Sequence, residues 1–87
     1  MLKGKLENGF KFKIEEYKLD DIEMLELMSK ADENPLIFPR VIDKLLGEEQ
    51  KQALYETLRT DKGNVPIQAV SDAVAEMFEK VGELKNS

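Results

Sequence analysis

The sequence predicts one mostly helical α+β domain spanning residues 1–87: an N-terminal two-stranded antiparallel β-hairpin followed by a four-helix orthogonal or bundle-like domain. Three observations indicate this fold. Apolar and charged residues alternate over about residues 2–15, as they do in half-buried strands. Apolar residues then recur every three or four positions in four later segments, as they do on amphipathic helices. A chain of 87 residues also leaves room for only one small core.

The predicted hairpin follows from the parity of its apolar residues. Charged residues occupy odd positions, and the even positions hold Leu2, Gly4, Leu6, Phe10, Phe12 and Ile14. A two-residue Asn8-Gly9 turn would pair Glu7 with Phe10 and mix the two faces of the hairpin. A three-residue loop over 7–9 pairs Leu6 with Phe10 and keeps every apolar side chain on one face. We therefore expect the three-residue loop, with a positive φ at Gly9.

The other face of the predicted hairpin carries four lysines, namely Lys3, Lys5, Lys11 and Lys13. Residues 1–18 hold five Lys and three Glu, a net charge of +2, so the other 69 residues carry −7 of the total of −5. Two interpretations remain open. The lysines guard exposed strand edges against pairing with other sheets, or they form a docking face for an acidic partner, including another copy of this chain.

The first helix is predicted over about residues 21–31. Asp20 is the expected N-cap, with Glu23 completing a capping box and Leu19 packing on Met24 as a hydrophobic staple. The apolar spacing indicates a buried side formed by Ile22, Leu25 and Met28, with Met24 and Leu27 widening it. The helix dipole alone explains the acidic residues of the first turns, so we expect no metal ion there.

Two helices are predicted next, over about residues 39–46 and 48–60, with Gly47 between them as a left-handed cap. Pro35 and Pro39 favour a turn over 35–38, because a proline disfavours helical geometry at the residue before it. The expected inward residues of the two helices are Val41, Ile42, Leu45, Leu46, Ala53, Leu54, Tyr55 and Leu58. The turn itself holds Leu36, Ile37 and Phe38, which either bind a partner or close the bottom of the core.

The last helix is predicted over about residues 66–84, after a turn at 61–64. Its apolar residues follow an a/d heptad pattern and are Ile67, Val70, Val74, Met77, Val81 and Leu84. A pattern of about two and a half heptads has two interpretations. It packs the helix on its own domain, or it joins two copies of the chain.

The composition excludes several classes of function. The chain has no Cys and no His, which removes thiolate nucleophiles and the commonest metal ligand and general base. Its five glycines are too scattered for a phosphate-binding loop, and its net charge of −5 disfavours nucleic-acid binding. No apolar run approaches the roughly 20 residues of a membrane span. We therefore expect a protein-binding module with no cofactor, no membrane or nucleic-acid partner and no enzymatic activity.

Several short segments, taken in order, resemble one family. They are Gly9-Phe10-Lys11-Phe12, Leu19-Asp20-Asp21-Ile22-Glu23, Asn34-Pro35-Leu36, Leu45-Leu46-Gly47-Glu48-Glu49-Gln50, Asp61-Lys62-Gly63-Asn64-Val65 and Leu84-Lys85-Asn86-Ser87. Their order and the chain length resemble the tail assembly chaperones of long-tailed (siphovirus-type) phages and prophages. The resemblance implies a non-catalytic protein of the bacterial host cytoplasm, absent from the finished virion.

The same resemblance implies the partners. Such a chaperone binds the tape measure protein, keeps it soluble and helps tail-tube subunits assemble around it. For this sequence we expect the binding residues to be Leu36, Ile37 and Phe38, and the lysine face if it serves for docking. The alternative is a head–tail connector or other structural phage adaptor that forms a ring. A DNA-mimicking inhibitor is disfavoured, because the carboxylates are spread along several helices and interrupted by lysines.

Overall fold

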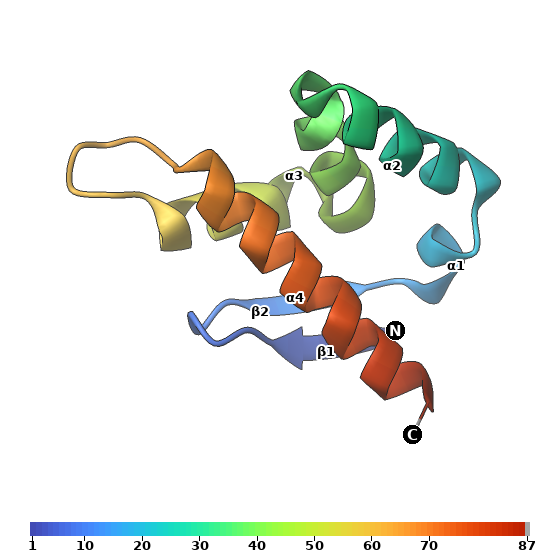
Figure 1. The fold of residues 1–87 in the computed structure, drawn as a ribbon. Helices are drawn as coiled ribbons and strands as arrows, with labels where there is room; N and C mark the ends of the chain where they lie inside the picture. Colours follow the sequence, from blue (N-terminus) through green and yellow to red (C-terminus); the bar gives the residue numbers. More distant parts are fainter. Residues whose placement is uncertain (87) are drawn as a thin grey trace.

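The N-terminal hairpin lies at one end of the molecule in the computed structural model, and the helices cover its apolar face (Figure 1). The structure describes the backbone of residues 1–86 and the side chains of residues 1–83. Its elements are β1 (Leu2–Lys5), β2 (Lys11–Ile14), α1 (Glu16–Leu19), α2 (Ile22–Glu33), the 3-10 helix η1 (Pro35–Ile37), α3 (Phe38–Leu58) and α4 (Ile67–Asn86). The predicted class, a β-hairpin followed by helices, is confirmed.

The hairpin has the predicted register. Leu2 pairs with Ile14 and Gly4 with Phe12. Leu6 N–H donates to Phe10 O at 2.9 Å. The loop therefore has three residues, and Gly9 has the expected positive φ of 94°. All the large apolar side chains of the hairpin are buried, as their even positions in the sequence require.

Polar side chains from the helices hold the hairpin at its β2 edge and at its loop. At the β2 edge the Gln50 carboxamide pairs with the Lys13 backbone, accepting from its N–H at 2.8 Å and donating to its carbonyl at 2.9 Å. Beyond β1, Glu7 N–H donates to Glu76 Oε2 at 2.9 Å. A two-stranded hairpin is marginal alone, and these bonds fasten it to α3 and α4.

The start of α2 differs from the prediction in two ways. The chain first forms the short helix α1, and the N-cap of α2 is Asp21 rather than Asp20, with its carboxylate accepting from Glu23 N–H at 3.0 Å. The buried stripe is also different: Met24 is buried, whereas Ile22 and Leu25 are 68% and 60% exposed. Apolar residues cover more than half of the circumference of α2, so spacing alone left the buried side ambiguous.

The segment around the two prolines forms η1, and α3 begins directly after it at Phe38. Gly47 interrupts α3 with φ 83° and ψ 164°, so the two predicted helices are present on either side of it. The cap itself is wrong in detail, because this ψ is extended rather than left-handed helical. Ala53 was expected to point inward but is exposed, and Leu54 fills the core position beside it.

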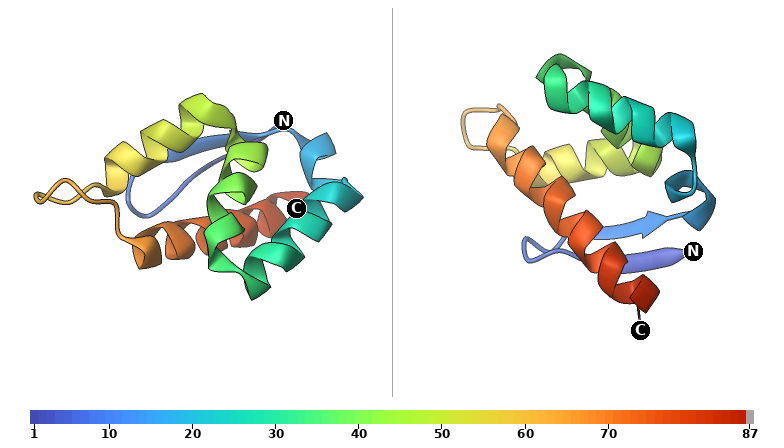
Figure 2. Two further views of the ribbon diagram at one scale, coloured as in Figure 1. Left: turned by 90° about the horizontal axis from the view of Figure 1, so that it is seen from above. Right: turned by 45° about the vertical axis from the view of Figure 1, so that its right-hand side comes forward.

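Helix α4 crosses the hairpin and supplies the opposite wall of the core, while α2 lies at the end away from the hairpin (Figure 2). Val70, Val74, Met77 and Val81 are buried, so this seam packs on its own domain. Ile67 was expected in the seam but is 79% exposed, because the first turn of α4 extends beyond the core. The predicted inward side chain of Leu84 lies outside the described side chains. Within the described residues, no helix has the length and apolarity of a membrane span.

Candidate functional site

An open apolar groove of about 580 Å³ lies between α2, the start of α3 and the N-terminal half of α4. Met28 of α2, Phe38 and Val41 of α3, and Val74 and Phe78 of α4 are among its lining residues. Val41 and Val74 are buried beneath it, so the groove reaches down to the core. Its volume is in the range of ligand-binding pockets, and its open shape leaves the lining accessible from solvent.

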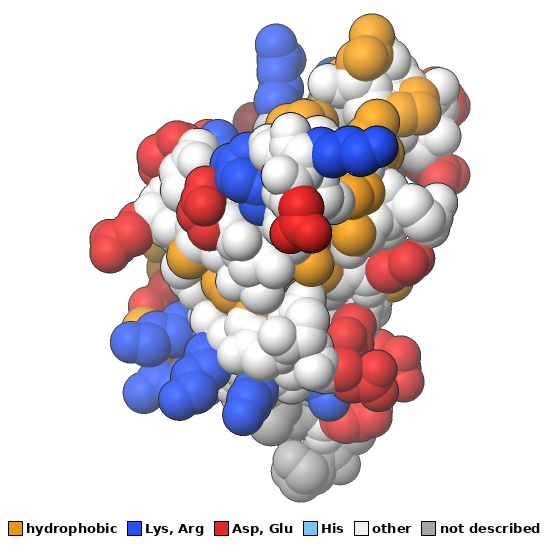
Figure 3. Space-filling view, turned by 90° about the vertical axis from the view of Figure 1, so that its left-hand side faces the viewer, with side chains coloured by type: hydrophobic (Ala, Val, Ile, Leu, Met, Phe, Trp, Pro, Cys, Tyr) orange, Lys and Arg blue, Asp and Glu red, His pale blue; other side chains and the backbone are white. Residues whose placement is uncertain are grey.

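Large apolar side chains stand exposed at the mouth of this groove. Leu25 on α2 and Ile67 on α4 line it and are 60% and 79% exposed. Leu36, which follows the lining residue Pro35, is 88% exposed. Figure 3 shows apolar side chains gathered along the upper right of the molecule in that view. Single exposed apolar residues are ordinary, but several beside one hollow mark a binding surface.

The predicted binding segment 36–38 lies at this groove, with a different role for each residue. Leu36 is exposed and is not part of the lining, and Phe38 lines the groove while also packing against the core. Ile37 is half-buried and is not part of the lining. The two interpretations of this segment are therefore not exclusive, since Phe38 both supports the core and faces the groove.

Two residues of the groove, Leu25 and Ile67, were missed because the sequence pattern assigned them to the core. A signal for each was present. Leu25 is adjacent to Met24, and neighbours in a helix differ by about 100° in direction, so only one of the two faces the core directly. Ile67 follows Pro66 at the very start of α4, where a helix commonly projects past the element on which it packs.

The predicted lysine face is present on the outer side of the hairpin. Lys3 lies opposite Lys13, and Lys5 opposite Lys11, and all four are exposed. Like charges directly opposite each other destabilise a strand pair. The structure does not bring this face to the groove: none of the groove lining comes from the hairpin. In Figure 3, one group of Lys and Arg side chains lies at the lower left, and others lie at the top and beside the apolar side chains of the upper right.

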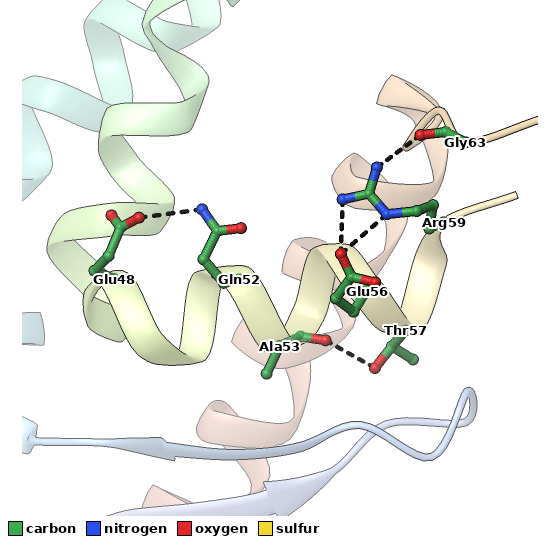
Figure 4. A network of polar contacts seen from close by, with 7 residues as sticks. All are labelled: Glu48, Gln52, Ala53, Glu56, Thr57, Arg59 and Gly63. Atoms are coloured by element: carbon green, nitrogen blue, oxygen red, sulfur yellow. Dashed lines mark hydrogen bonds and ion pairs between the residues drawn. The ribbon is translucent and has the colours of Figure 1, made fainter.

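The main polar network lies along the second half of α3, away from the groove. Its members include the Glu48–Gln52 hydrogen bond and the Arg59 guanidinium, which donates to Glu56 and to the Gly63 carbonyl (Figure 4). The Lys51 ammonium, 2.8 Å from Glu48 Oε2, and the Gln52 amide lower the pKa of Glu48. The Glu48 carboxylate in turn raises the pKa of Lys51. These bonds stabilise the helix end and the turn after it, and they build no site.

The groove has little polar chemistry of its own. Its polar side chains are Ser29, Asp32 and Ser71, and within the described residues no group of His, Cys, Asp or Glu is arranged to hold a metal ion. Comparisons of the chain with protein-family models, with curated proteins and with solved structures found no match. The arrangement suits the binding of an apolar surface.

Proposed function

We propose that this chain is a non-catalytic binding protein whose groove covers an apolar helix of a partner protein. In this role it is a phage or prophage tail assembly chaperone that binds the tape measure protein, keeps it soluble and assists tail-tube assembly. The observation that carries the proposal is the apolar groove, with Leu25 and Ile67 of its lining exposed to solvent. The sequence resemblance to the chaperone family supplies the identity of the partner.

A helix is the occupant that best matches the shape and chemistry of the site. Grooves lined by apolar side chains between helices commonly bind the apolar face of an amphipathic helix. A tape measure protein is long and helical, and it exposes apolar stripes until the tail tube encloses it. Binding in the groove would bury such a stripe, and the net charge of −5 on the small domain would help keep the complex in solution.

Co-expression with the longest helical protein encoded next to this chain tests the proposal. The amount of that protein in the soluble fraction should rise when this chain is present, and affinity capture should recover both proteins together. The variant Ile67→Glu should lose this effect. Ile67 is 79% exposed, so the substitution leaves the core intact and places a charge where the partner would bind.

Tyr17→Glu is the matched control, because Tyr17 is 70% exposed and lies on α1, outside the groove lining. It should behave as the unmodified chain does. Equal solubilisation by Ile67→Glu and Tyr17→Glu would refute the groove as the site. If the chain captures nothing and runs alone as a closed ring of fixed size, the structural alternative, a head–tail connector, replaces the chaperone.

A further inference from the structure

Along each of the two helical walls of the groove, an acidic residue twice follows a lining residue directly in the sequence. On α2, buried Met24 precedes the lining residue Leu25, and exposed Glu26 follows it. Farther along, half-buried Ala31, lining Asp32 and exposed Glu33 repeat the order. Successive residues of a helix differ by about 100°. In each triplet the exposed carboxylate therefore lies about 100° around the helix from the lining residue, on the side that faces solvent, and we call this side of each wall its rim.

The same order recurs on α4, the facing wall. Buried Val70 precedes lining Ser71 and exposed Asp72. Buried Met77 precedes lining Phe78 and exposed Glu79. The two rims thus hold four carboxylates, Glu26, Glu33, Asp72 and Glu79, and Asp32 adds a fifth in the lining. Two exposed cations also adjoin the lining in sequence, Lys30 after Ser29 and Arg40 before Val41, and they offset part of this charge.

We propose that the groove selects an amphipathic helix whose apolar stripe is flanked on both sides by Lys or Arg. The inference rests on the proposed function, because it takes the groove to be a helix-binding site and adds the charge of the helix that fits. An apolar stripe buried in the groove would bring its flanking residues beside the two acidic rims. Opposite charges there speed the encounter and favour the correct partner, and like charges exclude the wrong one.

The charge pattern also argues against a second copy of this chain as the occupant. The exposed apolar residues of α2 and α4 are themselves bordered by the carboxylates named above, so either helix would bring acidic flanks to acidic rims. Four of the eleven lysines lie on the hairpin, which has no helix to insert. A basic helix of a different protein satisfies both the apolar lining and the rims.

Three synthetic helical peptides test the inference. They share one leucine stripe and differ only in the residues beside it, which are Lys, Gln or Glu. Fluorescence anisotropy at low salt should give the Lys-flanked peptide an affinity about tenfold above that of the Glu-flanked one, since each exposed ion pair contributes little but several act together. Raising the salt to about 0.5 M should remove most of the difference, because the Debye length then falls well below 10 Å.

Two double variants of equal net charge distinguish an effect of the rim carboxylates from an effect of the net charge of the domain. Glu26→Gln with Glu79→Gln removes one carboxylate from each rim, and the total of −5 becomes −3. Glu16→Gln with Glu49→Gln has the same total, but neither of these exposed residues is next to a lining residue in the sequence. The rim variant should bind the Lys-flanked peptide about threefold more weakly than the control variant, since two exposed ion pairs are lost.

The possible results distinguish failure of charge selection from failure of the helix-binding function. Equal binding of the three peptides, or equal effects of the two double variants, would overturn charge selection and leave the groove as a helix-binding site. Failure of all three peptides to bind would overturn both the inference and the helix-binding function. Circular dichroism of each variant would confirm that the domain remains folded.

Discussion

The tightest packing constraint in the hairpin is at Gly4, where the ring of Phe12 lies across the glycine from the paired strand. A methyl group on Gly4 would lie 2.5 Å from Phe12 Cζ and 2.7 Å from Cε1. Neither distance is tolerable for two carbon atoms, and Phe12 is fully buried, so its ring has no free space into which to move. Gly4→Ala must therefore displace the ring or separate the strands.

The expected cost of Gly4→Ala follows from this overlap. Forcing an extra methyl group into a packed core costs about 1–3 kcal/mol. With an entropy of unfolding of about 2.1 cal/mol/K per residue, a chain of this length loses about 5 °C in melting temperature for each kcal/mol. We therefore expect the melting temperature of Gly4→Ala to fall by about 5–15 °C.

Gly82→Ala is the matched control, because it makes the same chemical change but is expected to raise the stability of the domain instead of lowering it. Nothing lies within 4 Å of a methyl group at Gly82, which is inside α4. Replacing a helical glycine by alanine stabilises by about 0.5–1 kcal/mol, or a few degrees. Thermal unfolding followed by circular dichroism measures both variants. A Gly4→Ala domain as stable as the unmodified one would refute the packing of Phe12 over Gly4.

Two further predictions concern polar contacts of α3. Gln50→Ala should lower the free energy of unfolding by about 1–2 kcal/mol and speed hydrogen exchange of the Lys13 amide, because it removes both bonds to the β2 edge; an unchanged exchange rate would contradict this account. Because Lys51 lowers the pKa of Glu48 in the folded state, the resulting stabilisation is present above the ordinary carboxyl value of 4.5 and is lost as the pH falls through the lower folded value. Glu48→Gln should flatten that part of the profile of melting temperature against pH, and a profile identical to that of the unmodified chain would show that the pair contributes nothing.

The hairpin could be predicted in detail because successive residues of a strand point to opposite faces, so each side chain is either on the buried face or on the exposed one. A shift of one residue in the register would expose Phe12 and Ile14 and bury lysines, so only the three-residue loop was consistent with the sequence. The break at Gly47 could also be predicted, since its positive φ favours glycine. The short helix α1 was missed because its four residues carry no periodic pattern of their own.

The candidate site was only partly predictable, because a groove arises from the placement of separate helices. The segment 36–38 stood out, since large apolar residues between two prolines are unusual in a turn. Leu25 and Ile67 were assigned to the core, because apolar residues at helical spacing look the same whether they face the interior or an open groove. Which of two adjacent stripes on α2 is buried depends on how α3 and α4 pack, and that information is not local.

Photo-crosslinking tests the central claim, that the groove is the surface that binds the partner, most directly. Chains with a photoreactive benzoyl-phenylalanine at Leu25, at Ile67 or at the control position Tyr17 would be expressed together with the proposed partner, the tape measure protein. The account predicts crosslinks from Leu25 and Ile67, which line the groove, and none from Tyr17, which lies on α1. Crosslinks from Tyr17 alone, or from a probe at Lys11 on the hairpin but from neither groove position, would contradict it.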